Sequence, residues 1–303
     1  MPGFDVVGFG ALNVDKLFKV NRIAEAEEES FVQSHVESCG GSAANTMVGL
    51  ARLGCKVGFV GKVAADREGA LLLEDFQKGA VDSGGVVRAN HGHSGQVIGF
   101  VDEKGERALY IESGVNDTIR LYEVSAKYVS QSRFLHLTSF VGEESFQTQQ
   151  QLLDLLPETK VSFDPGALYA RRGFEGLEHL IRRTYVMMPN ANELKLISGI
   201  EDYCKGADFL VGVGVKVVAV KLGADGCYAT DGRERLVIEA FPVKAVDTTG
   251  AGDAFDAGFL YGLLNNKSLH ECGRLGNFVA SRCVMKMGAR TGLPYLKDLS
   301  LVR

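Results

Sequence analysis

Asp253 follows three small residues, Gly250, Ala251 and Gly252, at the expected start of a helix over Ala254–Leu264. The first N–H groups of a helix have no partner within the helix, and the helix dipole adds partial positive charge there, so this turn is suited to bind an anion. A carboxylate beside a bound phosphate can accept the proton of an attacking hydroxyl, which is what phosphoryl transfer requires. Alternatively, Asp253 only caps the helix, since acidic residues favour a first turn.

A second group of residues has the chemistry needed to bind hydroxyls. Asn13 and Asp15 follow an expected buried strand, where open α/β sheets bind ligands. Asn45 lies just before an expected helix over Thr46–Leu53, and its amide both donates and accepts hydrogen bonds. The glycines before it leave bare backbone for a substrate. A structural explanation is also available, because Asn and Asp are common in turns and small residues pack tightly at helix starts. The candidates are Asn13, Asp15, Gly40, Gly41 and Asn45.

The stretch Asp-Thr-Thr-Gly-Ala-Gly-Asp-Ala-Phe, from Asp247 to Phe255, resembles the C-terminal signature of the ribokinase-like (PfkB) carbohydrate kinase family. Gly-Gly-x-x-x-Asn, from Gly40 to Asn45, is similar to the family's second signature, and the resemblance covers nearly the whole chain. It implies that Asp253 is the general base and that the amides of Gly250, Ala251 and Gly252 hold the transferring phosphoryl group. It also implies that the second group of residues binds the sugar.

The same resemblance implies a nucleotide site for ATP with Mg²⁺, and leaves open a monovalent cation such as K⁺. Glu193 would act on Mg²⁺ indirectly, through water, although Asn190-x-x-Glu193 is also a helix-capping pattern. Lys221 stands where relatives often carry Thr; it would contact a phosphate as a point charge, or else be solvated. The residues implied on this side are Asn190, Lys221, Gly223, Gly226 and Asn277.

Strands and helices alternate from Asp117 onward, which predicts an α/β fold with a doubly wound, mostly parallel central sheet and helices on both faces. Two stretches interrupt the alternation with β-like segments, and we expect them to form one small β lid that closes over the sugar site. The predicted lid comprises residues 13–40 and 91–116. The predicted core comprises 1–12, 41–90 and 117–303. The core strands are expected at Val6–Phe9, Val57–Val60, Phe134–Leu137, Val161–Phe163, Val186–Met188 and Val217–Val220.

Composition indicates which partners and which compartment to expect. The 303 residues carry 38 acidic and 33 basic side chains, a net charge of −5, which argues against nucleic acid as a partner. The six cysteines are scattered without metal-ligand spacing, which favours a reducing compartment, the cytoplasm. No apolar run approaches membrane-spanning length.

The sequence therefore predicts an ATP- and Mg²⁺-dependent kinase that phosphorylates a hydroxymethyl group of a sugar or a sugar-like acceptor. A nucleoside kinase of the same fold is the alternative, and a non-catalytic sugar-binding regulator is the rival from another class. An acidic acceptor would need a cation, for which Arg107, Arg171 and Arg172 are candidates. An exposed β lid leaves edges that a second copy could cover, so a homodimer through the lid is expected.

Overall fold

The computed structural model describes residues 3–104 and 106–302, and of Arg107 only the backbone. Within these residues a central sheet has nine strands. They are β1 (Phe4–Phe9), β4 (Val57–Ala64), β5 (Val81–Ala89), β8 (Ser132–Leu137), β9 (Lys160–Phe163), β10 (Thr184–Met187), β11 (Val217–Lys221), β12 (Cys227–Thr230) and β13 (Arg235–Ile238). Their spatial order is β13-β12-β11-β10-β9-β8-β1-β4-β5. The pairs β11–β12 and β12–β13 are antiparallel, and the other neighbouring pairs are parallel.

Helices cover both faces of this sheet, because successive residues of its strands point to opposite sides and both sides are apolar. Val6 packs in one core cluster and Val7 in the other. The first cluster includes residues of α1 (Ser42–Arg52), α2 (Arg67–Lys78), α9 (Ala251–Leu264) and α10 (Leu269–Cys283). The second includes residues of α3 (Ala126–Val129), α4 (Glu143–Asp154), α5 (Gly166–Ala170), α6 (Gly173–Arg183), α7 (Ala191–Ser198) and α8 (Tyr203–Gly212). The predicted doubly wound architecture is confirmed.

The order of the strands reverses at β1. From β1 the chain builds one side of the sheet through β4 and β5, and then returns to build the other side from β8 to β11. Connections therefore leave the carboxyl ends of β1 and β8 in opposite directions, which opens a crevice between them. The fold places its ligand-binding crevice at this point.

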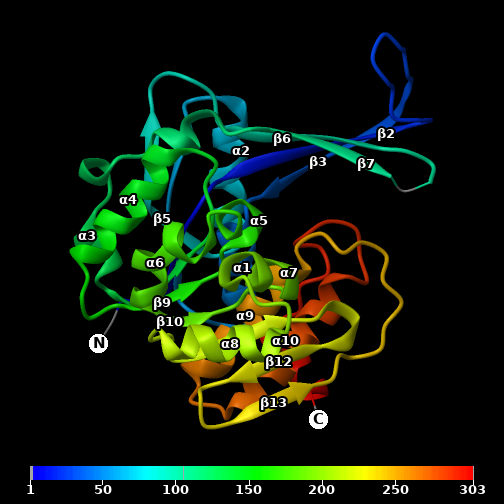
Figure 1. The fold of residues 1–303 in the computed structure, drawn as a ribbon. Coiled ribbons are helices and arrows are strands. Elements are labelled where there is room, and N and C mark those ends of the chain that lie inside the picture. Colours follow the sequence, from blue (N-terminus) through cyan, green and yellow to red (C-terminus); the bar gives the residue numbers. More distant parts are fainter. Residues whose placement is uncertain (1–2, 105, 303) are drawn as a thin grey trace.

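A separate four-stranded sheet, which we call the small sheet, projects from the core (Figure 1). It contains β2 (Asn13–Val20), β3 (Val32–Gly40), β6 (Gly95–Val101) and β7 (Arg107–Glu112), in the order β3-β2-β6-β7. The pairs β2–β3 and β6–β7 are antiparallel, whereas β2 and β6 are parallel. Its strands come from the two segments predicted to form a lid. That the small sheet closes over a substrate stays a prediction.

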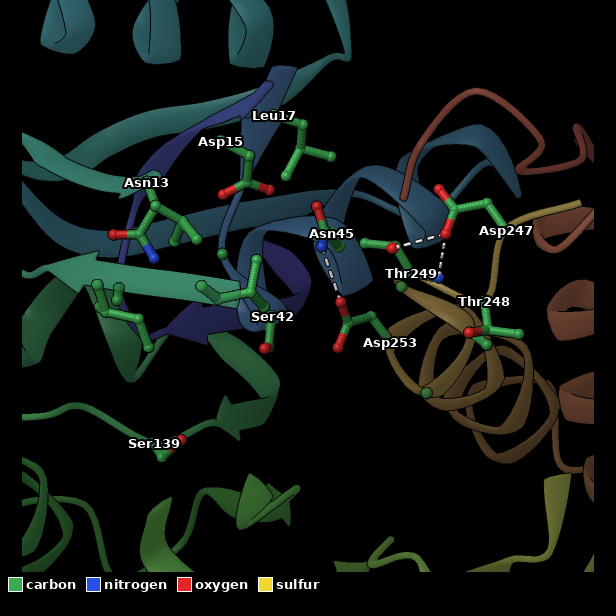
Figure 2. Close-up of a pocket in the computed structure, with 18 of the residues that line it drawn as sticks. Asn13, Asp15, Leu17, Ser42, Asn45, Ser139, Asp247, Thr248, Thr249 and Asp253 are labelled. Carbon is green, nitrogen blue, oxygen red and sulfur yellow. Dashed lines mark hydrogen bonds between the residues drawn. The ribbon is translucent and has the colours of Figure 1, made fainter. Parts of the chain in front are cut away.

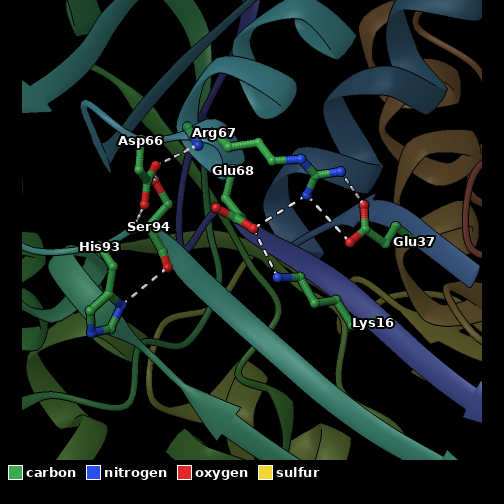
Figure 3. Close-up of polar contacts among 8 residues, drawn as sticks. Lys16, Glu37, Asp66, Arg67, Glu68, His93 and Ser94 are labelled. Carbon is green, nitrogen blue, oxygen red and sulfur yellow. Dashed lines mark hydrogen bonds and ion pairs between the residues drawn. The ribbon is translucent and has the colours of Figure 1, made fainter. Parts of the chain in front are cut away.

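Polar contacts attach the small sheet to the start of α2 (Figure 3). Lys16 of β2 forms an ion pair with Glu68, with 2.8 Å between Nζ and Oε1. Asp66, the N-cap residue of α2, accepts hydrogen bonds from the backbone N–H and the hydroxyl of Ser94, which directly precedes β6. Both strands that form the middle of the small sheet are therefore tied to one helix end.

The bounds of several elements differ from expectation. Helix α1 begins at Ser42 instead of Thr46, because Gly41, at a φ of 102°, turns the chain into the helix one turn earlier. Ala43, Ala44 and Asn45 are buried one after another in that turn, so no amphipathic pattern marks its start. Strand β4 continues to Ala64, beyond its expected end at Val60. Three strands of the central sheet, β5, β12 and β13, were not predicted.

In the part of the chain that the structure describes, no helix is both long enough and apolar enough to cross a membrane. The η elements are short 3-10 turns at Gly114–Thr118, Leu121–Glu123, Gly223–Asp225 and Leu296–Leu301.

Candidate active site

The site is built around the first turn of α9. Gly250 is the N-cap residue and has a φ of 75°, a conformation that favours glycine. A β-carbon at this position would also lie 2.5 Å from Cβ of Ala289, so position 250 has no room for a side chain. Asp253 follows as the third helical residue, in the same first turn. The predicted combination of a small-residue helix start and a carboxylate is therefore present.

Helix α1 brings Asn45 to Asp253. The two helices pack closely at Gly49 and Ala257, where an added β-carbon on the glycine would lie 2.8 Å from Cβ of the alanine. Residues four positions apart share a helix face. One turn before this contact, Nδ2 of Asn45 donates to Oδ2 of Asp253 at 2.8 Å (Figure 2). Thr46 adds a bond from its hydroxyl to the backbone carbonyl of Asp253 at 3.2 Å.

The Asp253 carboxyl is poised to exchange a proton near neutral pH. Burial raises its pKa from 3.8 to about 6, against the hydrogen bond from Asn45, which lowers it. A general base works best when its pKa lies near the working pH.

A cavity of about 860 Å³ opens between the small sheet and the start of α9. Its polar side is lined by Asn13, Asp15, Gly41, Asn45 and Asp253 (Figure 2). Side chains of the small sheet form its apolar side: Leu17, Val97, Val101, Leu109 and Ile111. Four of the five predicted sugar-binding residues thus line one cavity, together with Asp253, the predicted base.

Gly40, the fifth predicted sugar-binding residue, is not among the described residues that line this cavity. It ends β3, and a β-carbon on it would lie 2.3 Å from Oδ2 of Asp15. Gly40 therefore leaves space for the Asp15 carboxylate. The pKa of Asp15 is raised to about 6, chiefly by burial, while the charge of Arg290 lowers it.

Asn116 orients Asn13. It is fully buried, and its Nδ2 donates to Oδ1 of Asn13 at 3.0 Å and to the backbone carbonyl of Leu12 at 2.9 Å. One lone pair of the Asn13 oxygen is thus used inside the protein, while its NH₂ group can still donate to an acceptor hydroxyl. Asn116 carries no local sequence signal for this role.

A second cavity, of about 540 Å³, lies on the other side of the α9 turn. Four of the five residues predicted to bind the nucleotide line it: Lys221, Gly223, Gly226 and Asn277. Residues that border both cavities are Ala245, Thr248, Ala251 and Gly252. The turn predicted to bind an anion is therefore the common wall between the two cavities.

Lys221 is not solvated. Its Nζ lies 2.9 Å from Oδ2 of Asp164 and 3.4 Å from Oδ1 of Asp256, and both carboxylates are buried. Burial alone would lower the pKa of Lys221, but the carboxylates of Asp164 and Asp256 raise it above its usual range. The ammonium group also lies 3.3 Å from the position that a β-carbon on Gly252 would take, so its charge lies directly beside the anion turn.

Asn190 and Glu193 cap helix α7, as the local pattern predicted. Oδ1 of Asn190 accepts from the Glu193 N–H at 2.9 Å, and Oε2 of Glu193 accepts from the Asn190 N–H at 2.8 Å. Asn190 does not appear among the described residues that line either cavity. Its nucleotide contact, and the indirect action of Glu193 on Mg²⁺, remain predictions.

The three arginines considered as partners of an acidic acceptor are Arg107, Arg171 and Arg172. Arg172 forms an ion pair with Glu143 at 2.8 Å and lies over the ring of Phe146. Arg171 is exposed next to it. The side chain of Arg107 lies outside the described residues. The described lining of the larger cavity contains no Lys or Arg.

Four polar residues near the site were missed by sequence reasoning: Asn116, Asp164, Asp256 and Arg290. Asp164 directly follows β9, a position that could have indicated a site. Asp256 lies one turn beyond Asp253 on α9, and that spacing was a usable signal as well. Asn116 and Arg290 act through contacts with residues more than 100 positions away, which no local pattern reveals.

The chain is similar to known carbohydrate kinases in sequence and in fold. The family model described as pfkB family carbohydrate kinase matches residues 4–296. An uncharacterized sugar kinase of Archaeoglobus fulgidus is 44% identical over 254 residues, which is 83% of this chain and all of that protein. An ATP-dependent ribose-1-phosphate kinase of Halopiger xanaduensis is 32% identical over 94% of each chain. The crystal structure of a ribokinase from Thermotoga maritima superposes with a TM-score of 0.88, at 26% identity and 99% coverage of both chains.

Proposed function

Because this chain belongs to the pfkB family of carbohydrate kinases, we propose that it transfers the terminal phosphoryl group of ATP to a hydroxymethyl group of a sugar, with Asp253 as the general base. One observation carries the proposal. The two cavities meet at Ala251 and Gly252, and Asp253 is the next residue. A phosphoryl group bound at this turn would face a hydroxyl in the larger cavity.

In the proposed mechanism the smaller cavity binds the nucleotide, and the free N–H groups of the α9 turn hold the transferring phosphoryl group. The Lys221 ammonium lies beside that turn as a hydrogen-bond donor, with much of its charge balanced by Asp164 and Asp256. Asp253 accepts the proton of the acceptor hydroxyl as the hydroxyl oxygen attacks. The name of the Halopiger xanaduensis relative supports ATP as the donor.

Mg²⁺ prefers oxygen ligands and is often bound mainly through nucleotide phosphates. When bound, it would neutralise charge on the transferring group. One oxygen of Glu193 already accepts a backbone hydrogen bond, and we propose that this residue acts on the ion through water. Dependence on a monovalent cation such as K⁺ is a further proposal from the family resemblance, to be tested by exchanging K⁺ for Na⁺ in the assay.

A nucleoside acceptor is the second candidate. The cavity has a polar side suited to a ribose and an apolar side, formed by residues such as Leu17, Val97 and Ile111, suited to a base. A sugar alone would leave much of that apolar side uncovered unless another surface closes on it.

A second copy of the chain is one such surface, and we propose a homodimer through the small sheet. Val36, Leu109 and Ile111 are 65%, 52% and 54% exposed, which is unusual for a row of apolar residues on one sheet face. We also propose a cytoplasmic location, because the six cysteines are scattered and unpaired in the structure.

The test is a screen of sugars, sugar phosphates, sugar acids and nucleosides for acceptor-dependent ADP release. At least one acceptor should give turnover. With that acceptor, Asp253→Asn should lower kcat by at least about 10²-fold, with little change in ATP affinity, because the shape of the site is kept and only the base is removed. Near-normal turnover by Asp253→Asn would contradict its role, and the absence of any acceptor would favour a sugar-binding regulator.

A further inference from the structure

Arg290 is a buried arginine that the proposed mechanism does not yet use. It lies in the segment after α10 and is 9% exposed. Its Nε donates to Oδ1 of Asn45 at 2.7 Å, and its Nη2 donates to the backbone carbonyl of Gly40 at 3.1 Å. Its Nη1 forms an ion pair with Asp75 of α2. Three different elements therefore fix the guanidinium group.

The chemistry of these groups determines how the Asn45 amide is oriented. A guanidinium group only donates hydrogen bonds, so the amide oxygen must face Arg290. The amide nitrogen then faces Asp253, to which it donates at 2.8 Å. The reversed amide would place NH₂ against the guanidinium and its oxygen against the carboxylate, two repulsive contacts. Arg290 therefore selects one of the two amide orientations.

This orientation determines which oxygen of Asp253 can react. Oδ2 is held by Asn45, and the other oxygen points away from Asn45 in Figure 2. We propose that Arg290 is a positioning residue for phosphoryl transfer, which acts through Asn45 to hold the Asp253 carboxylate with one oxygen turned toward the acceptor hydroxyl. The inference rests on the proposed function of Asp253 as the base.

Asn45 can still contact the substrate in this arrangement. An amide has two N–H donors and two lone pairs on its oxygen, and each bond described above uses one of them. One donor and one acceptor remain for hydroxyls. The contacts of Asn45 to the protein and its predicted contacts to a sugar are therefore compatible.

Arg290 also contributes charge near the base. Other ionisable groups that act on or are affected by Asp253 are Lys221, Asp164, Asp256 and Cys283. The charges of Arg290 and Lys221 lower the pKa of Asp253, whereas that of Asp164 raises it. Removal of the Arg290 charge should move the titration of Asp253 to higher pH, which a residue with only a packing role would not do.

Two substitutions separate orientation from charge. Arg290→Lys keeps the charge but replaces the planar fork by a single ammonium group. Arg290→Met removes both. We expect each variant to lower kcat by up to about 10²-fold, the effect of a small misplacement of a reacting group, with the ATP KM nearly unchanged. Only Arg290→Met should move the acid limb of the pH–rate profile to higher pH. The matched control is Arg282→Met, which removes a half-buried arginine of α10 that contacts Phe278 and should keep wild-type kcat.

A double variant tests the route through Asn45. If Arg290 acts through that amide, Asn45→Ala with Arg290→Met should be no slower than Asn45→Ala alone, because the same interaction cannot be lost twice. The proposal would be overturned if the kcat losses of the two single variants multiply fully in the double variant. It would also be overturned if both Arg290 variants keep wild-type kcat. If the Arg290 variants do not fold, Asp75→Asn releases the guanidinium from its anchor and should give a smaller loss in the same direction.

A measurement without turnover keeps this inference separate from the proposed function. The Asp253 carboxyl can be titrated by ¹³C NMR in the ligand-free protein and in Arg290→Met. A higher midpoint in the variant supports the coupling even if no acceptor is phosphorylated, in which case only the proposed function fails. Equal midpoints together with an unchanged kcat would contradict the inference while the kinase function stands.

Discussion

At the scale of single residues, the buried carboxyl of Asp253 should set the pH range of the enzyme. Its pKa is raised to about 6, chiefly by burial, so the base carries a proton at lower pH and cannot accept one from the acceptor. We expect kcat/KM to fall as the pH drops below about 6 and to be independent of this group well above it. A pH–rate profile on protein shown to be folded at each pH would test this. An acid limb near pH 4 would contradict the raised pKa.

The same raised pKa has a consequence for stability. The folded protein holds this proton more tightly than the unfolded chain does, so the stabilising contribution is complete below pH 3.8 and is lost as the pH rises through about 6. Asp253→Asn is uncharged at every pH and avoids that loss. Its Tm should exceed that of the wild type at pH 8, and the difference should shrink toward zero near pH 4. A difference that does not depend on pH would show that burial of the charge is not the cause.

Asp15 tests whether the acceptor presents hydroxyls to the polar side of the cavity. A carboxylate that loses its water to a ligand without gaining a hydrogen bond costs about 1–3 kcal/mol or more, so a hydroxyl of the acceptor should face Asp15. Asp15→Ala should raise the acceptor KM by about tenfold to a hundredfold and leave the ATP KM nearly unchanged. A deoxy acceptor that lacks the contacted hydroxyl should bind the wild type less well and lose little more with the variant. If the losses of binding free energy from Asp15→Ala and from the deoxy acceptor simply add, Asp15 does not touch that hydroxyl.

At the scale of elements, the start of α9 should tolerate no branched side chain. A β-carbon at Gly252 would lie 3.3 Å from Nζ of Lys221, and the residue borders both cavities. Gly252→Val should lower kcat/KM for ATP by about tenfold or more, because the branches block the approach of a phosphate. Gly212→Val is the control, since it adds the same side chain to helix α8 where nothing lies within 4 Å of the new β-carbon. Normal kinetics in a folded Gly252→Val protein would exclude this turn as the phosphate site.

The small sheet should move as one unit, because its four strands share one hydrogen-bonded sheet. The ion pairs Lys16–Glu68 and Glu37–Arg67 attach it to α2 (Figure 3). Saturating acceptor with an ATP analogue should slow hydrogen exchange in residues 13–40 and 91–116 together. Glu68→Gln should speed exchange in both segments of the ligand-free protein. Unchanged protection on ligand binding would count against a lid.

At the scale of the whole molecule, the exposed face of the small sheet should determine the oligomeric state. Val36 pairs with Leu17, and Ile111 pairs with Val97, so these residues lie across from each other on strands of one sheet. Light scattering should report a dimer at assay concentration, and Val36→Lys should weaken it because the charge would be buried in the interface. A monomeric wild type would contradict the proposed dimer.

The sequence by itself determined the local features of this protein. The small residues before Asp253, the capping pair Asn190 and Glu193, and the alternation of strands and helices depend on backbone conformation and on neighbours a few positions away, so they could be predicted from the chain alone. Asn13 and Asp15 could be predicted as site residues because they come soon after β1, and side chains that follow parallel strands meet at one edge of the sheet.

Only the tertiary structure decided which distant residues meet. Arg290 reaches Asn45 across 245 positions, and Asn116 reaches Leu12 across 104, because the order of strands in the sheet brings their segments together. The ion pairs of Lys221 with Asp164 and Asp256 were decided in the same way, by the packing of distant elements against one another. Such contacts depend on the packing of the whole chain, and a local sequence pattern carries no record of a partner that lies elsewhere in it.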